Sequence, residues 1–95
     1  MEFEWDSGNL LKSLAKHGIT QQESEQVCLH LYLLEIDKTH SSNEIRFKIL
    51  GKTDLGRILY IIFTTRLNKI RIISARPADK GERKTYEWKQ TKANS

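Results

Sequence analysis

The spacing of hydrophobic residues in the first third of the chain is that of amphipathic helices. Leu10, Leu11 and Leu14 fall on one face of a predicted helix over residues 7–16. A second helix is predicted over residues 20–30, where a threonine followed three residues later by a glutamate has the pattern of a capping box. The chain is therefore expected to begin with two short helices that each bury one face.

From residue 31 the spacing changes to that of β-strands. Alternation over residues 44–50 predicts a strand with one polar face, and the apolar run over residues 57–65 predicts a central strand buried on both faces. Further strands are predicted over residues 31–36 and 69–76, and a short strand around residues 3–5 would extend one edge. Because the connections between the four main strands are short, neighbouring strands are predicted to run antiparallel.

The C-terminal part of the chain predicts one more helix. Asp79 and Glu82 have the spacing of a capping box at the start of a helix over residues 79–88. Residues 89–95 offer nothing to bury and are predicted to be a disordered tail. The predicted fold is α+β in a single domain over residues 1–88, with two N-terminal helices, a four-stranded antiparallel meander sheet that a short edge strand can extend, and a C-terminal helix.

The charge of the chain is unevenly distributed. Residues 1–56 contain six Lys/Arg and nine Asp/Glu, a net charge of −3, whereas residues 57–95 contain ten and three, a net charge of +7, and the sum is the +4 of the whole chain. A basic half of this kind favours contact with a polyanion, and nucleic acid is the leading candidate. A basic surface that serves only solubility, or one that an acidic protein partner covers, would fit the same distribution of charge.

Several kinds of chemistry are disfavoured by what the sequence lacks. Cys28 is the single cysteine, which excludes an internal disulfide and a cysteine-based zinc site. The three histidines form no metal-binding pattern, and neither a glycine-rich phosphate loop nor a serine or cysteine nucleophile motif is present. No cofactor is expected. The chain shows no signal peptide and no apolar stretch that could cross a bilayer, so a cytoplasmic location is expected.

Charged guanidinium groups interrupt the most apolar predicted strands. Four arginines lie in these strands or at their ends: Arg46, Arg66, Arg71 and Arg76. A guanidinium is costly to bury unpaired, so each needs a carboxylate partner or an open face with a phosphate nearby. Strict alternation places Arg71 and Arg76 on opposite faces. One of them is therefore expected to reach phosphate, and the other to pair with Glu82 or Glu87.

Two further residues have more than one plausible role. His40 lies in a polar loop and is suited to acid–base chemistry by its ordinary pKa near 6.5, although simple solvation is the more common explanation for a lone loop histidine. Tyr86 lies on the last predicted helix, where its ring can stack on a nucleic-acid base or pack on the sheet.

Three segments carry motifs that together point to one protein family. They are FEWDSGNLLKSLAKHGI from Phe3, HSSNEIRFKILGKT from His40, and GRILYIIFTTRLNKIRIISARPADKGERKTYE from Gly56. The most specific features are the IRIISAR block and the spacing from Trp-Asp to His-Gly. Over residues 3–88 the chain resembles the BrnT family of type II toxin–antitoxin ribonucleases.

The resemblance implies a fold, an activity and a set of partners. It implies a RelE-like fold and a toxin that cleaves RNA and so inhibits translation. A BrnA-type antitoxin is then the expected protein partner, in a hetero-oligomer with the toxin. The antitoxin, through its ribbon-helix-helix domain, is the part that would bind operator DNA. RNA is the expected substrate, and no association with a membrane is expected.

The resemblance also suggests roles for the charged residues. RNA carries its own nucleophile, the 2′-OH, so an enzyme need only align it, remove its proton and stabilise the charge on the phosphate, and no metal is needed. The residues expected to hold the scissile phosphate or to shuttle protons are His40, Glu44, Arg46, Lys48, Arg66, Arg71 and Arg76. The residues expected to make further RNA contacts are Arg57, Lys69 and Tyr86. A module that binds RNA or DNA without cleaving it, and a subunit that only meets its antitoxin, remain as alternatives.

Overall fold

A computed structural model describes residues 2–5, 14–30, 34–36 and 44–93 of the chain. The elements are β1 Glu2–Trp5, α2 Gln21–His30, β2 Leu34–Ile36, β3 Arg46–Lys52, β4 Ile58–Arg66, β5 Lys69–Pro77 and α3 Lys80–Ala93. Residues 14–17 are also helical and are the described part of the helix predicted over residues 7–16. The rest of that predicted helix lies outside the described residues.

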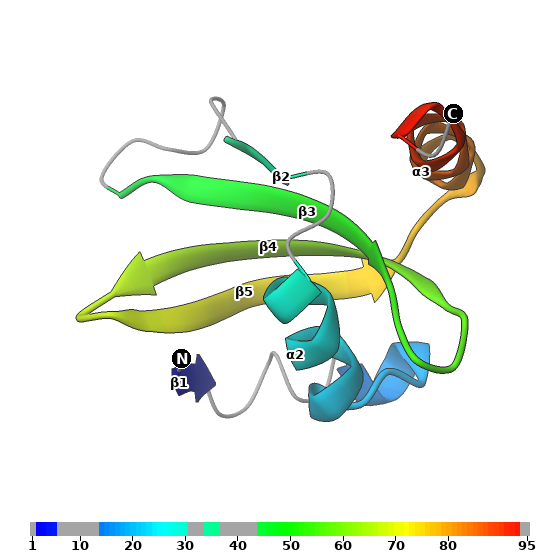
Figure 1. Ribbon diagram of the computed structural model, residues 1–95. Coiled ribbons are helices and arrows are strands. Elements are labelled where there is room, and N and C mark those ends of the chain that lie inside the picture. The colour runs from blue at the N-terminus through cyan, green and yellow to red at the C-terminus, as the bar shows by residue number, and fades with distance from the viewer. Residues whose placement is uncertain (1, 6–13, 31–33, 37–43, 94–95) are drawn as a thin grey trace.

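The strands form one mixed sheet in the order β1-β5-β4-β3-β2 (Figure 1). The four strands from β2 to β5 follow one another as an antiparallel meander, which confirms that part of the prediction. β1 adds a fifth strand at the edge and runs parallel to β5, so the sheet is not purely antiparallel. Short connections enforce antiparallel pairing, whereas β1 reaches β5 from the far end of the sequence and is under no such constraint.

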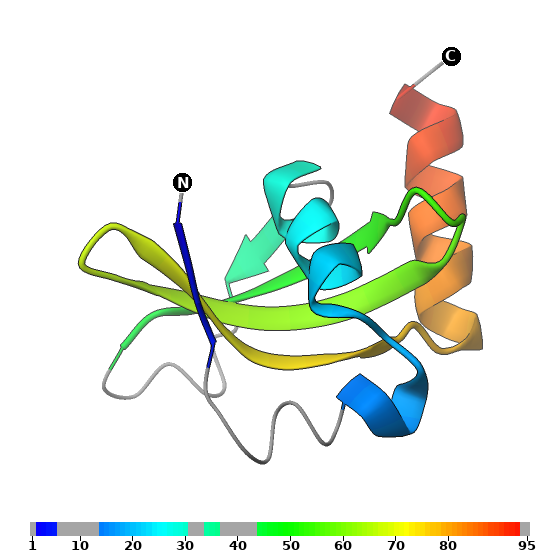
Figure 2. The same ribbon diagram turned by 90° about the horizontal axis from the view of Figure 1, so that it is seen from below.

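The helices lie on different sides of the sheet (Figures 1 and 2). α2 packs on β3 and β4, and the helical residues 14–17 lie on the same side. α3 stands at one end of the sheet, and the β4–β5 hairpin projects at the opposite end. We call the face opposite α2 the open face, because among the described residues only its α3 end carries a helix.

The hydrophobic core fills the space between α2 and the sheet. Val27 and Cys28 of α2 are fully buried against Ile49, Leu59 and Ile61 of the neighbouring strands. Burial raises the pKa of the Cys28 thiol to about 12, so the group is a neutral, apolar part of the core at physiological pH.

Gly51 lets α2 approach β3 closely. A Cβ at this position would lie 2.8 Å from Cγ1 of Val27, closer than two carbon atoms tolerate. The glycine belongs to β3, which runs through to Lys52, and not to the following turn as its sequence context suggests. Any larger residue here would push α2 away from the sheet.

β4 is the central strand of the sheet, as predicted, but only one of its faces is fully buried. Its side chains alternate between buried residues such as Leu59 and Ile61 and half-buried residues such as Tyr60 and Ile62. The expectation that both faces would be buried is wrong, because α3 covers only one end of the open face.

Both helix starts predicted from capping boxes are confirmed. The Glu23 N–H donates to Thr20 Oγ1 at 3.0 Å, and the Thr20 N–H donates to Glu23 Oε1 at 3.3 Å. At the start of α3 the Glu82 N–H donates to Asp79 Oδ1 at 2.8 Å, and the Asp79 N–H donates to Glu82 Oε1 at 2.9 Å. Each pair satisfies backbone donors that have no partner within the helix.

α3 is longer than its sequence suggests. It runs to Ala93, whereas residues 89–95 were predicted to be a disordered tail. Lys89 contributes to this extension, since its Nζ lies 3.9 Å from Glu35 Oε1 of β2. This pair joins residues 54 positions apart, a contact that the local composition does not reveal.

Candidate nucleic-acid interface

A β-bulge in β5 decides which face of the sheet its arginines occupy. The pairing partners of Ile62 and Phe63 on β4 are two residues apart on β5, so Ile73 is an extra residue. An extra residue shifts the alternation of side chains by one position. Arg71 and Arg76 therefore leave the same face of the sheet, and the prediction that they lie on opposite faces is wrong.

Burial along β5 agrees with this assignment. Ile70, Ile72 and Ala75 are buried and face α2, while Arg71 and Arg76 are only partly covered. The strand register then defines the open face, on which the cations are carried by three strands. These cations are Arg46, Lys48 and Lys52 of β3, Arg66 of β4, and Lys69, Arg71 and Arg76 of β5.

Three of these arginines meet at the hairpin end of the open face. Arg46 and Arg71 are both register partners of Thr64, one on each side, and Arg66 follows two residues later on the same strand. Their side chains line a depression of about 180 Å³, which we call the arginine pocket. Its lining residues are Glu44, Arg46, Arg66, Arg71, Ile72 and Ile73.

Carboxylates accompany the cations at this end. Arg66 Nη2 lies 3.3 Å from Glu44 Oε2, and Arg71 Nη1 lies 3.3 Å from Glu4 Oε1 of β1. At the hairpin itself, Lys69 Nζ lies 3.6 Å from Glu2 Oε2 of β1. These pairs are partly exposed to solvent, so each contributes little to stability and can exchange for another anion.

Arg76 has a different environment at the α3 end. Its two terminal nitrogens donate to the two carboxylate oxygens of Glu82 at 2.8 and 2.9 Å, and its guanidinium lies 4.2 Å from the centroid of the Tyr60 ring. The hydrogen bonds from Arg76 lower the pKa of the Glu82 carboxyl below its usual value, and the same bonds raise the pKa of Arg76. The expected pairing of one arginine with Glu82 is confirmed, and it fastens α3 to β5.

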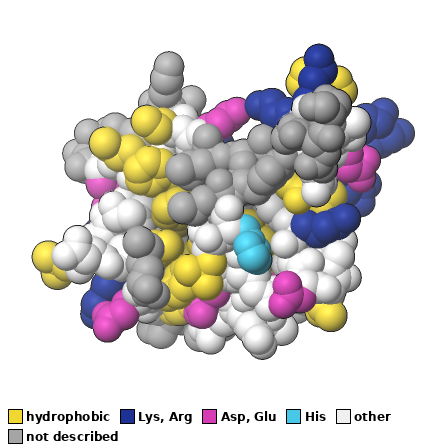
Figure 3. Space-filling model, viewed as in Figure 1, with side chains coloured by type: hydrophobic (Ala, Val, Ile, Leu, Met, Phe, Trp, Pro, Cys, Tyr) yellow, Lys and Arg dark blue, Asp and Glu magenta, His cyan; other side chains and the backbone are white. Residues whose placement is uncertain are grey.

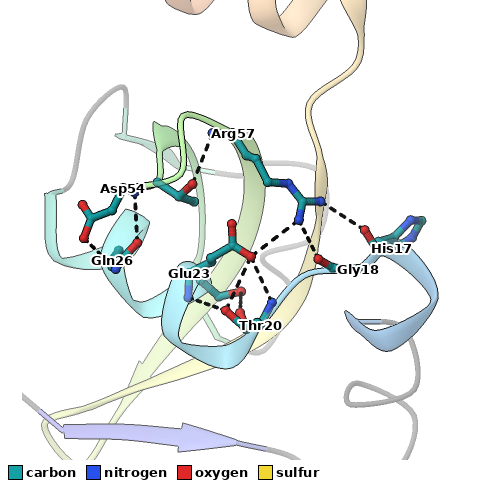
Figure 4. Close-up of polar contacts among 9 residues, drawn as sticks. His17, Gly18, Thr20, Glu23, Gln26, Asp54 and Arg57 are labelled. Atoms are coloured by element: carbon teal, nitrogen blue, oxygen red, sulfur yellow. Dashed lines mark hydrogen bonds and ion pairs between the residues drawn. The ribbon is translucent and has the colours of Figure 1, made fainter.

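Arg57, expected to contact RNA, lies in the helix layer instead (Figure 4). Its terminal nitrogens donate to the carbonyl oxygens of His17 and Gly18, and one of them lies 3.5 Å from Glu23 Oε1. These partners join the end of the first helical segment to the start of α2. Arg57 is thus engaged in the packing of the two helices and lies apart from the arginine pocket.

Three predicted site residues remain: Tyr86, Lys48 and His40. Tyr86 is only 5% exposed, so its ring packs within the protein, which is the second of the two roles expected for it. Lys48 lies on the open face and lines a groove of about 450 Å³ beneath α3. His40 lies outside the described residues.

Two site features were missed by sequence reasoning. Glu4 pairs with Arg71 because β1 lies beside β5, and the alternation of Glu2 and Glu4 with Phe3 and Trp5 was the available signal. Trp88 was not considered for a role, although it is 60% exposed on α3.

The described residues contain neither a metal-binding cluster nor a membrane-spanning helix. No group of three or more His, Cys, Asp or Glu side chains within residues 2–5, 14–30, 34–36 and 44–93 could hold a metal ion. In that same part of the chain, no helix is long and apolar enough to cross a membrane.

The fold and the site together define a class of small α+β proteins that present an arginine-rich sheet face. Residues 5–82 match the family model described as the ribonuclease toxin BrnT of type II toxin–antitoxin systems. The chain therefore belongs to the BrnT family, which confirms the family resemblance seen in the sequence.

A solved structure supports the same fold. The crystal structure of the Brucella abortus ribonuclease toxin BrnT is similar, with a TM-score of 0.60 at 22% sequence identity. The alignment covers 84% of this chain and 99% of that chain. A comparison with curated proteins finds no match.

Proposed function

We propose that this BrnT-family chain cleaves RNA at the arginine pocket, without a metal, by using the 2′-OH of the substrate as nucleophile. The observation that carries the proposal is the convergence of Arg46, Arg66 and Arg71 on one depression of the sheet, on a face that none of the described helices covers at this end. Guanidinium groups present fixed pairs of donors that match phosphate oxygens. Three of them can neutralise the charge that develops on the phosphate during cleavage.

The proposed reaction is an in-line transesterification. A base takes the proton of the 2′-OH, a bond forms between the 2′-oxygen and phosphorus, and the bond from phosphorus to the 5′-oxygen breaks. An acid returns a proton to the departing 5′-oxygen. The products are a 2′,3′-cyclic phosphate and a 5′-hydroxyl. The arginines contribute by holding the phosphate in place and by stabilising its additional charge in the transition state.

Three residues are candidates for the proton transfers. Glu44 lines the arginine pocket, and its Oε2 lies 3.3 Å from Arg66 Nη2, so its carboxylate would lie beside the proposed phosphate. Lys48 lies farther toward α3 and could serve as an acid only for a substrate that extends along the open face. His40 remains a candidate as well. We assign the role of general base to Glu44, because it is the one carboxylate among the described residues that line this pocket.

The proposed function includes partners. A BrnA-type antitoxin would neutralise the toxin in a hetero-oligomer, and operator DNA would be bound only through that antitoxin. Membership of a toxin–antitoxin family supports a protein partner of this kind. The cytoplasm, where both RNA and antitoxin are found, is the proposed location.

A cleavage assay tests the proposal directly. Purified, antitoxin-free protein is incubated with bulk RNA in excess EDTA, and the ends of the products are identified. Arg66→Ala should lower the rate by about 10²–10³-fold, the loss typical of one charge-stabilising donor. Arg83→Ala removes an exposed arginine of α3, outside the pocket, and should leave the rate unchanged.

Each contrary outcome of this assay points to a different function. Cleavage that EDTA abolishes would contradict metal independence. RNA that stays intact but is retained in a salt-sensitive manner would favour a nucleic-acid-binding module without catalysis. A stable complex with an acidic protein and no affinity for RNA would favour a subunit that only meets its antitoxin.

A further inference from the structure

α3 carries a tryptophan on its outer surface. Trp88 is 60% exposed, whereas Tyr86, two residues earlier, is only 5% exposed. Trp88 is also the one aromatic residue among the large hydrophobic side chains exposed in the described part of the chain. A ring of this size gains much by burial, so its position on the solvent side points to a contact with another molecule.

The surroundings of Trp88 are positively charged. Lys84 and Lys89 line a shallow depression with Trp88, and Lys92 Nζ lies 5.2 Å from the centroid of its ring. Figure 3 shows Lys and Arg side chains gathered over α3. An aromatic ring flanked by cations has the chemistry of a single-stranded nucleic-acid platform, in which the ring stacks on a base and the cations hold the phosphates.

The platform is connected to the open face of the sheet. The depression at Trp88 shares Thr85 and Lys89 with the groove beneath α3. That groove continues to Lys48 and Tyr60 on the open face, the face that carries the arginine pocket at its other end. An extended strand with its scissile phosphate in the pocket can therefore follow this face toward α3.

We propose that Trp88 stacks on a base of single-stranded RNA at a position away from the cleaved bond, with Lys84, Lys89 and Lys92 holding the flanking phosphates. The inference rests on the proposed RNA cleavage and adds a second binding site to it. The family match ends at residue 82, before Trp88, so this site is not part of what the match covers. The alternative occupant is an acidic protein segment. Such a segment would pair with the lysines, but it has no nucleic-acid base to stack on Trp88.

Fluorescence provides a direct test of stacking. The chain has two tryptophans, and Trp5, whose Nε1–H donates to Glu25, lies on β1, away from α3. Trp5→Phe leaves Trp88 as the only tryptophan. A short 2′-O-methyl oligoribonucleotide, which cannot be cleaved, should quench its emission, while polyglutamate of equal charge should not. Equal quenching by both polymers would overturn the stacking and favour an acidic protein partner.

Affinity measurements provide a second test. Trp88→Ala should weaken binding of the same oligonucleotide by about 10-fold, since stacking on one base is worth about 1–3 kcal/mol. Trp88→Phe should recover part of the loss. The matched control is Leu29→Ala, which removes a 59% exposed apolar side chain from α2 and should leave affinity unchanged.

The two proposals fail in different ways. If the wild-type protein neither binds nor cleaves RNA, both proposals are overturned. If it binds and Trp88→Ala binds equally well, only the inference about Trp88 is overturned. A short substrate that reaches only the arginine pocket should be cleaved at the same rate by Trp88→Ala, whereas a long one should show a raised KM with kcat unchanged.

Discussion

The two ends of the open face use the same pair of residue types for different purposes. At the α3 end, Arg76 and Glu82 share two short hydrogen bonds over the ring of Tyr60. At the hairpin end, Arg71 and Glu4 approach to 3.3 Å at the edge of the sheet. Both pairs are partly exposed, so the difference lies in their geometry. The first pair is bidentate and short and holds a helix in place, while the contact between Arg71 Nη1 and Glu4 Oε1 is longer, so a phosphate can take the place of the carboxylate there.

Replacing Arg71 should have the largest effect on activity. Arg71→Ala is expected to lower the cleavage rate by about 10²–10³-fold, because it removes a donor to the developing phosphate charge. The midpoint of thermal unfolding should change little, since the pair with Glu4 is partly exposed. Arg71→Lys keeps the charge but loses the fork, so it should recover only part of the rate.

The measurement that decides the Arg71 prediction is single-turnover cleavage together with an unfolding curve for each variant. A variant that loses activity only as far as it loses folded protein would contradict a role at the phosphate. In that case Arg71 would have a structural role at the hairpin end, as Arg76 has at the α3 end of the open face.

Replacing Arg76 should have the next largest effect, and on stability. Arg76→Ala is expected to lower the free energy of unfolding by about 1–2 kcal/mol, because it breaks the bidentate pair and leaves Glu82 without its partner. Urea denaturation measures this change. Combining Arg76→Ala with Glu82→Gln in a double-mutant cycle should show coupling of about 1 kcal/mol. Additive effects would mean that the pair does not hold α3.

The same pair predicts a pH dependence of stability. The pKa of Glu82 in the folded protein lies below its ordinary value of 4.5, so the contribution of Glu82 to stability is complete above that value. It is lost as the pH falls through the lowered pKa. The difference in free energy of unfolding between wild type and Glu82→Gln should therefore be largest near neutral pH and shrink in acid. A difference that stays constant with pH would exclude the ionised carboxylate as its source.

The smallest predicted effect concerns the partner of Arg71. Glu4→Gln should raise the affinity for a 2′-O-methyl oligoribonucleotide about threefold, because a partly exposed carboxylate competes only weakly with phosphate. The control is Glu2→Gln, which removes the same charge from β1 at a side chain that is 77% exposed and paired with Lys69. Equal gains for the two variants would show a general effect of charge and no competition at Arg71.

Local features of this fold could be predicted from sequence. Thr20 with Glu23 and Asp79 with Glu82 mark helix starts, because the bonds of a capping box join residues three apart. The meander of β2 to β5 follows from short connections. Glu82 could also be named as a partner of an arginine, since six residues separate it from Arg76 in sequence.

The features that escaped prediction depend on contacts between distant segments. β1 pairs with β5, and Arg71 meets Glu4 across 67 positions of sequence. The carbonyl groups that hold Arg57 lie 39 and 40 residues away, and no local pattern marks a backbone oxygen as a partner. The burial of Tyr86 and the exposure of Trp88 depend on where α3 docks, which the helix periodicity alone does not specify.

The bulge at Ile73 gives β5 one residue more than its pairing with β4 requires. Deleting Ile73 would leave Ile72 and Ser74 opposite the same partners on β4, and the residues after them would keep their present faces. Deleting a residue from the regular pairing of β4, such as Ile61, would instead turn the side chains beyond it to the wrong face of the sheet. β5 is therefore best shortened at Ile73. This deletion is expected to relax the local twist of the strand and to leave Arg71 and Arg76 on the open face.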